Sequence, residues 1–246
     1  MSEKIYTIPI SDTFEECVAD PGLGCPFCRL YNKLEENEVD TLLGAALMEP
    51  DIRIETNKKG FCDVHFARLL GGKNRLGLGL ITESHLDTLK KDLNEGAIPS
   101  LLGQSGKKMS KRLGELSESC YVCDRIDYNF TRMLTNAVLF YGEDEKFREN
   151  VGKVSYICLP HLRMLLSRAK DEMKKGYGDF AKKVSAPTLS YLDGLKDDVS
   201  LFCKKFDYRY DSEPWGNSKD SVERAGKFLC GDLHTQVKKP KTGENR

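Results

Sequence analysis

The sequence predicts an all-α protein with an internal duplication and a helical extension at its C-terminal end. Apolar residues recur at three- and four-residue intervals between charged residues, which is the pattern of amphipathic helices. One arrangement of cysteine and histidine residues also occurs twice along the chain. Because self-similarity at a fixed spacing indicates repeated structural units, the two copies are expected to share one fold.

Composition limits the classes to which the protein can belong. The chain has 246 residues with 38 basic and 38 acidic side chains, so it has no general attraction to nucleic acid or to an anionic membrane. No stretch reaches the roughly 20 apolar residues that span a bilayer, and the N-terminus lacks a signal peptide's apolar segment. We therefore expect a cytoplasmic protein. Its nine cysteines would stay reduced there, which indicates metal binding or redox chemistry.

Cysteine and histidine residues form the repeated pattern. A C-x2-C pair is followed by a C-x2-H pair, and both pairs then recur in the same order. The segments between them are 33 residues long in the first copy and 34 in the second. The four pairs are Cys25 and Cys28, Cys62 and His65, Cys120 and Cys123, and Cys158 and His161. Nearly equal spacing of like pairs indicates a duplication rather than a chance cluster.

The flanks of these pairs also agree. Residues 61–70 and 157–166 carry apolar side chains at matching positions, including two adjacent leucines. Apolar residues at helical spacing follow each C-x2-C pair, over residues 30–47 and 126–138. Each C-x2-H pair is expected to open a further helix, since Pro160 suits a first helical turn.

Four regions follow from these patterns. They are residues 13–100 (first repeat), 115–185 (second repeat), 188–231 (C-terminal helical extension with an aromatic strap) and 235–246 (disordered tail). Between the copies, residues 94–117 are rich in glycine, serine and basic residues, which predicts a linker or a mobile loop. Within the extension, helices are expected near residues 189–206 and 218–229.

The repeated pattern suits a tetrahedral metal ion. Structural zinc sites use four cysteine or histidine ligands, and one C-x2-C with one C-x2-H supplies three thiolates and an imidazole. We therefore expect two zinc ions per chain, one in each copy. The first site would hold Cys25, Cys28, Cys62 and His65, and the second Cys120, Cys123, Cys158 and His161. Exchange of pairs between the copies stays open. Four protein ligands leave no position for substrate, so such sites are structural.

Three cysteines lie outside the pattern. Cys17, Cys203 and Cys230 have no partners in the repeat. Because unpaired cysteines behave as small hydrophobic residues, we expect these three to be buried.

Two other chemistries use cysteines in this way. The segment Cys25-Pro26-Phe27-Cys28 resembles the C-P-x-C motif of thioredoxin-like enzymes, so Cys25 and Cys28 are candidates for thiol–disulfide exchange. That motif requires a preceding strand, whereas the turn residues 21–24 come before it here. An iron–sulfur cluster, which three cysteines and a histidine can also hold, is a less favoured cofactor.

Nucleic-acid binding is a further alternative. Lys107, Lys108, Lys111 and Arg112 form a modest basic cluster between the copies. The spacing of the metal ligands differs from that of groove-reading zinc fingers, and the chain is neutral overall. A solvated linker explains the cluster better.

An aromatic segment follows the predicted helix in the extension. Its residues Phe206, Tyr208, Arg209 and Trp215 could form a partner surface. The favoured interpretation is a strap that packs the C-terminal helices onto the repeats.

The C-P-x-C and G-F-C-x2-H motifs, with the segments K-F-D-Y-R at 205–209 and P-W-G at 214–216, resemble an uncharacterised bacterial domain-of-unknown-function family, found mainly in clostridia. The resemblance spans Thr13 to Gly231 and implies a bacterial cytosolic protein without assigned catalytic residues. We conclude that the chain binds zinc structurally. We expect a binding or scaffold role toward an unknown protein or small molecule rather than an enzymatic one.

Overall fold

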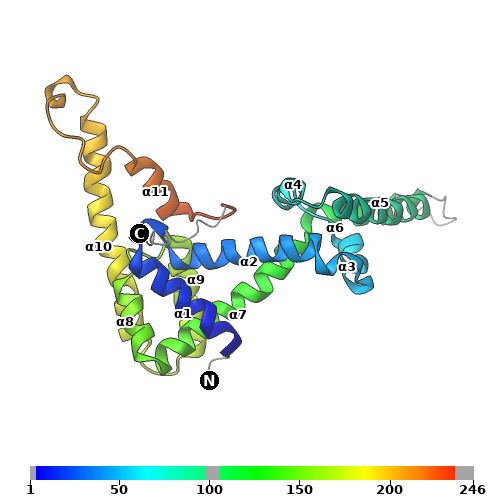
Figure 1. Cartoon of the computed structure of the whole chain (residues 1–246), viewed down its shortest axis with the longest axis horizontal. Helices are drawn as coiled ribbons and strands as arrows, with labels where there is room; N and C mark the ends of the chain where they lie inside the picture. Colours follow the sequence, from blue (N-terminus) through cyan, green and yellow to red (C-terminus); the bar gives the residue numbers. More distant parts are fainter. Residues whose placement is uncertain (1–3, 98–105, 236–246) are drawn as a thin grey trace, which may run out of the picture. The chain divides into compact units, whose positions relative to one another are not determined.

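A computed structural model describes residues 4–97 and 106–235, which form helices and no strands (Figure 1). This confirms the all-α prediction. The α-helices are α1 (Lys4–Ala19), α2 (Pro26–Leu43), α3 (Pro50–Lys59), α4 (Asp63–Gly71), α5 (Arg75–Ala97), α6 (Lys107–Glu118), α7 (Tyr121–Glu143), α8 (Glu145–Lys153), α9 (Leu159–Glu172), α10 (Tyr177–Lys204) and α11 (Ser221–Cys230). Short 3-10 helices cover Pro21–Leu23 (η1), Ala45–Met48 (η2) and Tyr208–Tyr210 (η3).

The helices form two compact units that do not follow the order of the sequence. Unit 1 contains the chain up to Lys33 and from Phe130 onward, and unit 2 contains Leu34–Asn129. The long helices α2 and α7 each contribute residues to both units. Each unit is therefore built from parts of both sequence copies.

Unit 1 is organised around α10. This helix packs against α8, α9 and α11, and α1 packs against α8. Three fully buried phenylalanines fill the space near α1, with ring centroids 5.4 Å apart for Phe14 and Phe27 and 4.9 Å apart for Phe14 and Phe147. Edge-to-face aromatic packing of this kind stabilises a core beyond the area that it buries.

Unit 2 is organised around α3 and α5, which pack against each other and against α6. Leu69, Leu78 and Ile81 are buried between its helices. Arg112 of α6 donates to the backbone carbonyls of Asn57 and Lys58 in the last turn of α3. These bonds satisfy carbonyls at a helix end that have no partner within the helix.

The predicted linker is wrong over most of its length. Residues 107–118 form α6, and α5 extends to Ala97; the intervening residues 98–105 lie outside the described part of the chain. Met109, Leu113 and Leu116 recur at helical spacing, a pattern that the surrounding glycines and lysines obscure. Arg112, from the predicted basic cluster, is bound within the protein through Asp92, 2.7 Å away.

The C-terminal extension is helical, as predicted, with different bounds. α10 begins at Tyr177, earlier than expected, and continues through Pro187, while α11 covers Ser221–Cys230. All but the first residue of the predicted tail lie outside the described residues. None of the described helices is long and apolar enough to cross a membrane.

The three cysteines outside the pattern differ in burial. Cys17 is buried, as predicted, whereas Cys203 and Cys230 are exposed, so the prediction was wrong for these two. The latter lie near or at the C-terminal ends of α10 and α11, where spacing alone does not indicate which side of a helix faces solvent.

Candidate metal centres

The eight predicted ligands come together in two groups of four. Centre 1 consists of Cys25, Cys28, Cys158 and His161, and centre 2 consists of Cys62, His65, Cys120 and Cys123. Within each group the possible ligand atoms all lie within 4.8 Å of one another. Centre 1 lies in unit 1 and centre 2 in unit 2.

The pairing within each copy, expected from the sequence, is wrong. Each C-x2-C pair meets the C-x2-H pair of the other copy. The local reason is the length of α2, which has 18 residues and carries the chain about 22 Å beyond Cys28 before it ends. The second copy has a similar long helix after Cys123. The exchange that the sequence left open is therefore the arrangement found.

All four ligand pairs occupy helix N-termini. Cys62 and Cys158 are the N-cap residues of α4 and α9, and Cys25 and Cys120 directly precede α2 and α7. The second ligand of each pair then falls in the first helical turn. Two helix N-termini thus face each centre, and their partial positive charge stabilises thiolates.

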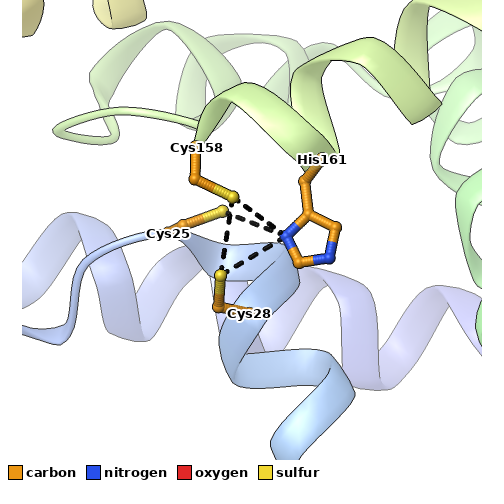
Figure 2. A group of neighbouring side chains, drawn as sticks. All are labelled: Cys25, Cys28, Cys158 and His161. Atoms are coloured by element: carbon orange, nitrogen blue, oxygen red, sulfur yellow. Dashed lines mark hydrogen bonds between the residues drawn. The ribbon is translucent and has the colours of Figure 1, made fainter. Parts of the chain in front are cut away.

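Centre 1 has the dimensions of a site for one ion. Figure 2 shows its four side chains pointing toward one another from the starts of α2 and α9. His161 Nδ1 lies 3.7, 3.4 and 3.2 Å from the sulfurs of Cys25, Cys28 and Cys158. The Cys28 and Cys158 sulfurs are 3.6 Å apart, close to the edge of about 3.8 Å for a tetrahedron with metal–sulfur bonds near 2.3 Å.

Centre 2 has the same dimensions. His65 Nδ1 lies 3.3, 3.4 and 3.3 Å from the sulfurs of Cys62, Cys120 and Cys123. The Cys62 and Cys123 sulfurs are 3.9 Å apart. These two cysteines are only partly buried, whereas every ligand of centre 1 is buried. Solvent and chelators therefore have better access to centre 2.

Backbone groups close over centre 1. The Asp232 N–H donates to Cys28 Sγ at 3.3 Å, which stabilises a thiolate. Gly231 has a φ of +87°, a conformation that favours glycine, and it brings the chain to this position. On another side, the Thr188 hydroxyl accepts from the N–H of Ile157 and donates to its carbonyl. This pair of bonds fixes the backbone directly before Cys158.

Charged side chains stand behind centre 2. Glu35 Oε1 lies 3.1 Å from His65 Nε2, and Glu35 Oε2 lies 2.9 Å from Arg68 Nη2. The side chains of Glu35 and His65 are completely buried. A buried carboxylate is strongly unfavourable unless it is paired, so both contacts stabilise it. Sequence reasoning missed Glu35 and Arg68, because charged residues in amphipathic helices are common.

The thiols within each centre compete for protons. In centre 1, hydrogen bonding with Cys158 and Cys25 raises the pKa of Cys28 far above its ordinary value. Burial acts in the same direction on Cys25, but hydrogen bonds from its three neighbours outweigh it and hold the Cys25 pKa well below its ordinary value. Close thiols cannot all ionise without a compensating cation. A bound dication would allow all three to be thiolates.

Centre 2 shows the same competition. Burial would raise the Cys120 pKa, but the hydrogen bond from His65 lowers it to about 6. Burial would also lower the His65 pKa, yet the Cys120 and Glu35 contacts raise it to about 10. Burial and the neighbouring Cys120 raise the pKa of Cys123 above its ordinary value. Without a cation, this centre favours a Cys120 thiolate paired with a His65 imidazolium, beside a protonated Cys123.

Substitution of Gly24 tests how tightly the backbone before centre 1 is constrained. Gly24 has a φ of +73°, and a Cβ there would lie 3.0 Å from Tyr156 Oη. We expect Gly24→Ala to lower the free energy of unfolding by about 1–3 kcal/mol. Gly194→Ala is the matched control: Gly194 lies in α10 with open space around it, and alanine there should stabilise by about 0.5–1 kcal/mol. Urea unfolding at fixed zinc concentration measures both, and equal effects would contradict the constraint.

Comparisons with known proteins place the chain in a family without an assigned role. Residues 1–236 match the model of a family described as a family of unknown function (DUF6062). No curated protein matches the chain. No solved structure matches it either. The function must therefore be inferred from the two centres themselves.

Proposed function

Because the chain belongs to the DUF6062 family of unknown function, we propose its role from its own geometry: it binds two structural zinc ions and serves as a helical scaffold for a binding partner. One ion occupies centre 1 and stabilises unit 1, and the other occupies centre 2 and stabilises unit 2. When bound, each ion supplies a positive charge that holds three thiolates and an imidazole together. The proposal includes no catalytic step.

The observation that carries the proposal is the closure of both centres. Each has four protein donors at the spacing of a tetrahedron around one ion. Zinc sites that catalyse reactions keep one position for water, whereas sites with four protein ligands are structural. Three thiolates and one imidazole are also a donor set that zinc accepts readily. These facts support structural zinc rather than an enzyme.

The geometry disfavours both other cysteine chemistries. Thiol–disulfide exchange requires an accessible thiolate, but Cys25 and Cys28 are each 3% exposed. An iron–sulfur cluster spreads its protein ligands over several metal atoms, whereas all four donor atoms of each centre lie within 4.8 Å of one another. A single ion fits these distances better.

Metal analysis of purified protein tests the proposal. We expect two zinc ions per chain by elemental analysis and by native mass spectrometry, in protein expressed without added metal. Thiol titration of the native protein should find Cys203 and Cys230 reactive, since they are exposed, and the six ligand thiols protected until a chelator is added. Protein without zinc but with visible iron–sulfur absorbance, or with a freely reactive Cys25, would overturn the proposal.

The loop after α10 favours a partner-binding role. Phe206 and Tyr208 are 76% and 82% exposed, so the strap predicted from the sequence is wrong for these two residues. Aromatic side chains are enriched at protein interfaces relative to the rest of the surface, and two of them are exposed within this short loop. We therefore include Phe206, Tyr208, Arg209 and Trp215 in a candidate partner surface.

Lys205 holds this loop in shape. Its buried ammonium group donates to the carbonyls of Tyr210, Asp211 and Glu213 and lies 5.5 Å from the centroid of the Trp215 ring. Three carbonyl acceptors and an aromatic face compensate the burial of the charge. A loop fixed in this way can present Phe206 and Tyr208 with little loss of conformational entropy on binding.

Replacement of Lys205 should release the loop. In Lys205→Met we expect three carbonyls to lose their donor, at about 1–3 kcal/mol of local stability. Amide exchange over residues 206–217 should accelerate, and the fluorescence of Trp215, the only tryptophan, should change. Lys196→Met, on an exposed part of α10, should leave both measurements unchanged. Unaltered exchange in Lys205→Met would show that the ammonium does not organise the loop.

A further inference from the structure

The two metal centres differ at one equivalent position. Counting seven residues from the second cysteine of each C-x2-C pair leads to Glu35 in the first copy and Phe130 in the second. Each of these residues lies against the histidine of its own copy: Glu35 Oε1 is 3.1 Å from His65 Nε2, and the Phe130 ring centroid is 5.2 Å from that of His161. The duplication has thus kept the contact and changed its chemistry.

A second equivalent position changes in the same way. Three residues after the histidine, the first copy has Arg68 and the second has Met164. Arg68 Nη2 contacts Glu35 Oε2 at 2.9 Å. The first copy therefore has a buried carboxylate and its guanidinium partner at two positions, and the second copy has an aromatic ring and a thioether at the equivalent two. The acid and its counter-charge occur together, which indicates that they act as a unit.

The placement of Glu35 matches what a metal-binding histidine requires. His65 directs Nδ1 toward the three sulfurs and Nε2 toward the carboxylate. A carboxylate at Nε2 keeps the proton on that nitrogen, so the lone pair of Nδ1 is available to the ion, and it makes the imidazole a stronger donor. No acidic group is paired with His161 among the described residues. Its ring instead lies near Phe27 and Phe130.

We infer that Glu35, held by Arg68, is a positioning residue that orients the His65 ring, with Nδ1 toward the sulfurs, and strengthens metal binding at centre 2 alone. The inference rests on the proposed function, since it requires an ion at that centre. It assigns different chemistry to the two copies. Centre 1 relies on burial and aromatic packing, whereas centre 2, with its partly exposed Cys62 and Cys123, relies on a charged pair behind its histidine.

The test compares variants of the full-length protein by competition with a chromophoric zinc chelator. Single Cys62→Ser and Cys28→Ser variants first assign the two release phases to centres 2 and 1. Glu35→Gln should then weaken the centre 2 phase by about 10-fold to 100-fold, as loss of such partners does at other zinc sites, and leave the centre 1 phase unchanged. The matched control is Glu38→Gln, on the same helix, where the acid contacts Arg125 and Asn129 instead. It should alter neither phase.

A second variant separates positioning from packing. Glu35→Met with Arg68→Met removes both charges while it keeps similar side-chain volumes, a change that buried ion pairs often tolerate. If the pair only fills space, this double variant should bind zinc as tightly as the wild type. If Glu35 positions His65, affinity at centre 2 should still fall. Proton–nitrogen correlation spectra of the loaded protein should also show the His65 Nε2–H resonance shifting and exchanging faster with solvent, because the carboxylate 3.1 Å from Nε2 is gone.

Three outcomes decide between these possibilities. Weaker zinc binding at centre 2 in Glu35→Gln and in the double variant, with a shifted and faster-exchanging His65 Nε2–H, supports the inference. Wild-type affinity and a wild-type Nε2–H resonance in the double variant overturn it while leaving two structural zinc sites in place. Absence of zinc from the wild-type protein instead overturns the proposed function. The failure of one is therefore distinguishable from the failure of the other.

Discussion

Removal of both metal ions is expected to unfold most of the protein. Metal binding at structural zinc sites contributes about 10–16 kcal/mol to folding at neutral pH, whereas the net stability of a whole domain is about 5–15 kcal/mol. The free energy of binding one such ion is therefore as large as the net stability that we expect for the unit that holds it. Far-UV circular dichroism of loaded, stripped and reloaded protein should show helicity lost with the metal and recovered with zinc.

The ligand positions explain why this effect is large. Centre 1 joins Cys28 to Cys158, which are 130 residues apart in the chain, and it is the meeting point of α2 and α9. Centre 2 joins Cys62 to Cys123 over 61 residues, where α4 and α7 begin. Without a cation, each centre becomes a cluster of buried polar groups whose protons are poorly accommodated. The metal-free centres would then destabilise the packing of the surrounding helices, whereas the loaded centres stabilise it.

Acid should have the same effect as chelation. A thiolate or imidazole must lose its proton before it can bind zinc, so metal affinity falls as the pH falls, and the stability of the loaded protein falls with it. Centre 2 should lose its ion first, because Cys62 and Cys123 are only partly buried. Stripped protein that keeps its full helicity and a cooperative thermal transition would contradict a structural role for the metals.

The fold class and the ligands could be predicted from the sequence because both leave periodic signals. Helical spacing of apolar residues predicted α2, α7 and α9, and the repeated C-x2-C and C-x2-H pairs identified all eight side chains that converge. The pairing could not be predicted, since either C-x2-H can complete either C-x2-C with the same donor set. Which C-x2-H pair meets which C-x2-C pair depends on where α2 and α7 carry the chain, and only the folded structure determines that.

Other parts of the site leave no sequence signal. The N–H of Asp232 that reaches Cys28 is a backbone group, and no residue type marks it. Glu35 is one of many acidic residues in the chain, and its contact with His65 depends on packing between α2 and α4. Helix α6 was missed for a different reason, because three glycines at 96, 103 and 106 obscured the periodicity that follows them.

The crossed pairing predicts metal contents that differ between two double variants by a whole ion. Cys28→Ser with Cys158→Ser alters two ligands of centre 1, so the protein should keep one zinc, at centre 2. Cys28→Ser with Cys62→Ser alters one ligand in each centre, so it should keep none. Pairing within each copy predicts no zinc in Cys28→Ser with Cys158→Ser and one zinc in Cys28→Ser with Cys62→Ser, because Cys28 and Cys62 would then share a single ion.

Native mass spectrometry of the two double variants distinguishes these arrangements even where a unit unfolds. Unit 2 contains every ligand of centre 2, so its ion can still be counted when unit 1 has lost its own. Cys203→Ser, which changes an exposed thiol outside both centres, is the control and should keep two. One zinc in Cys28→Ser with Cys62→Ser, and none in Cys28→Ser with Cys158→Ser, would reject the crossed arrangement. One zinc in Cys28→Ser with Cys158→Ser, and none in Cys28→Ser with Cys62→Ser, would show that each ion joins one sequence copy to the other.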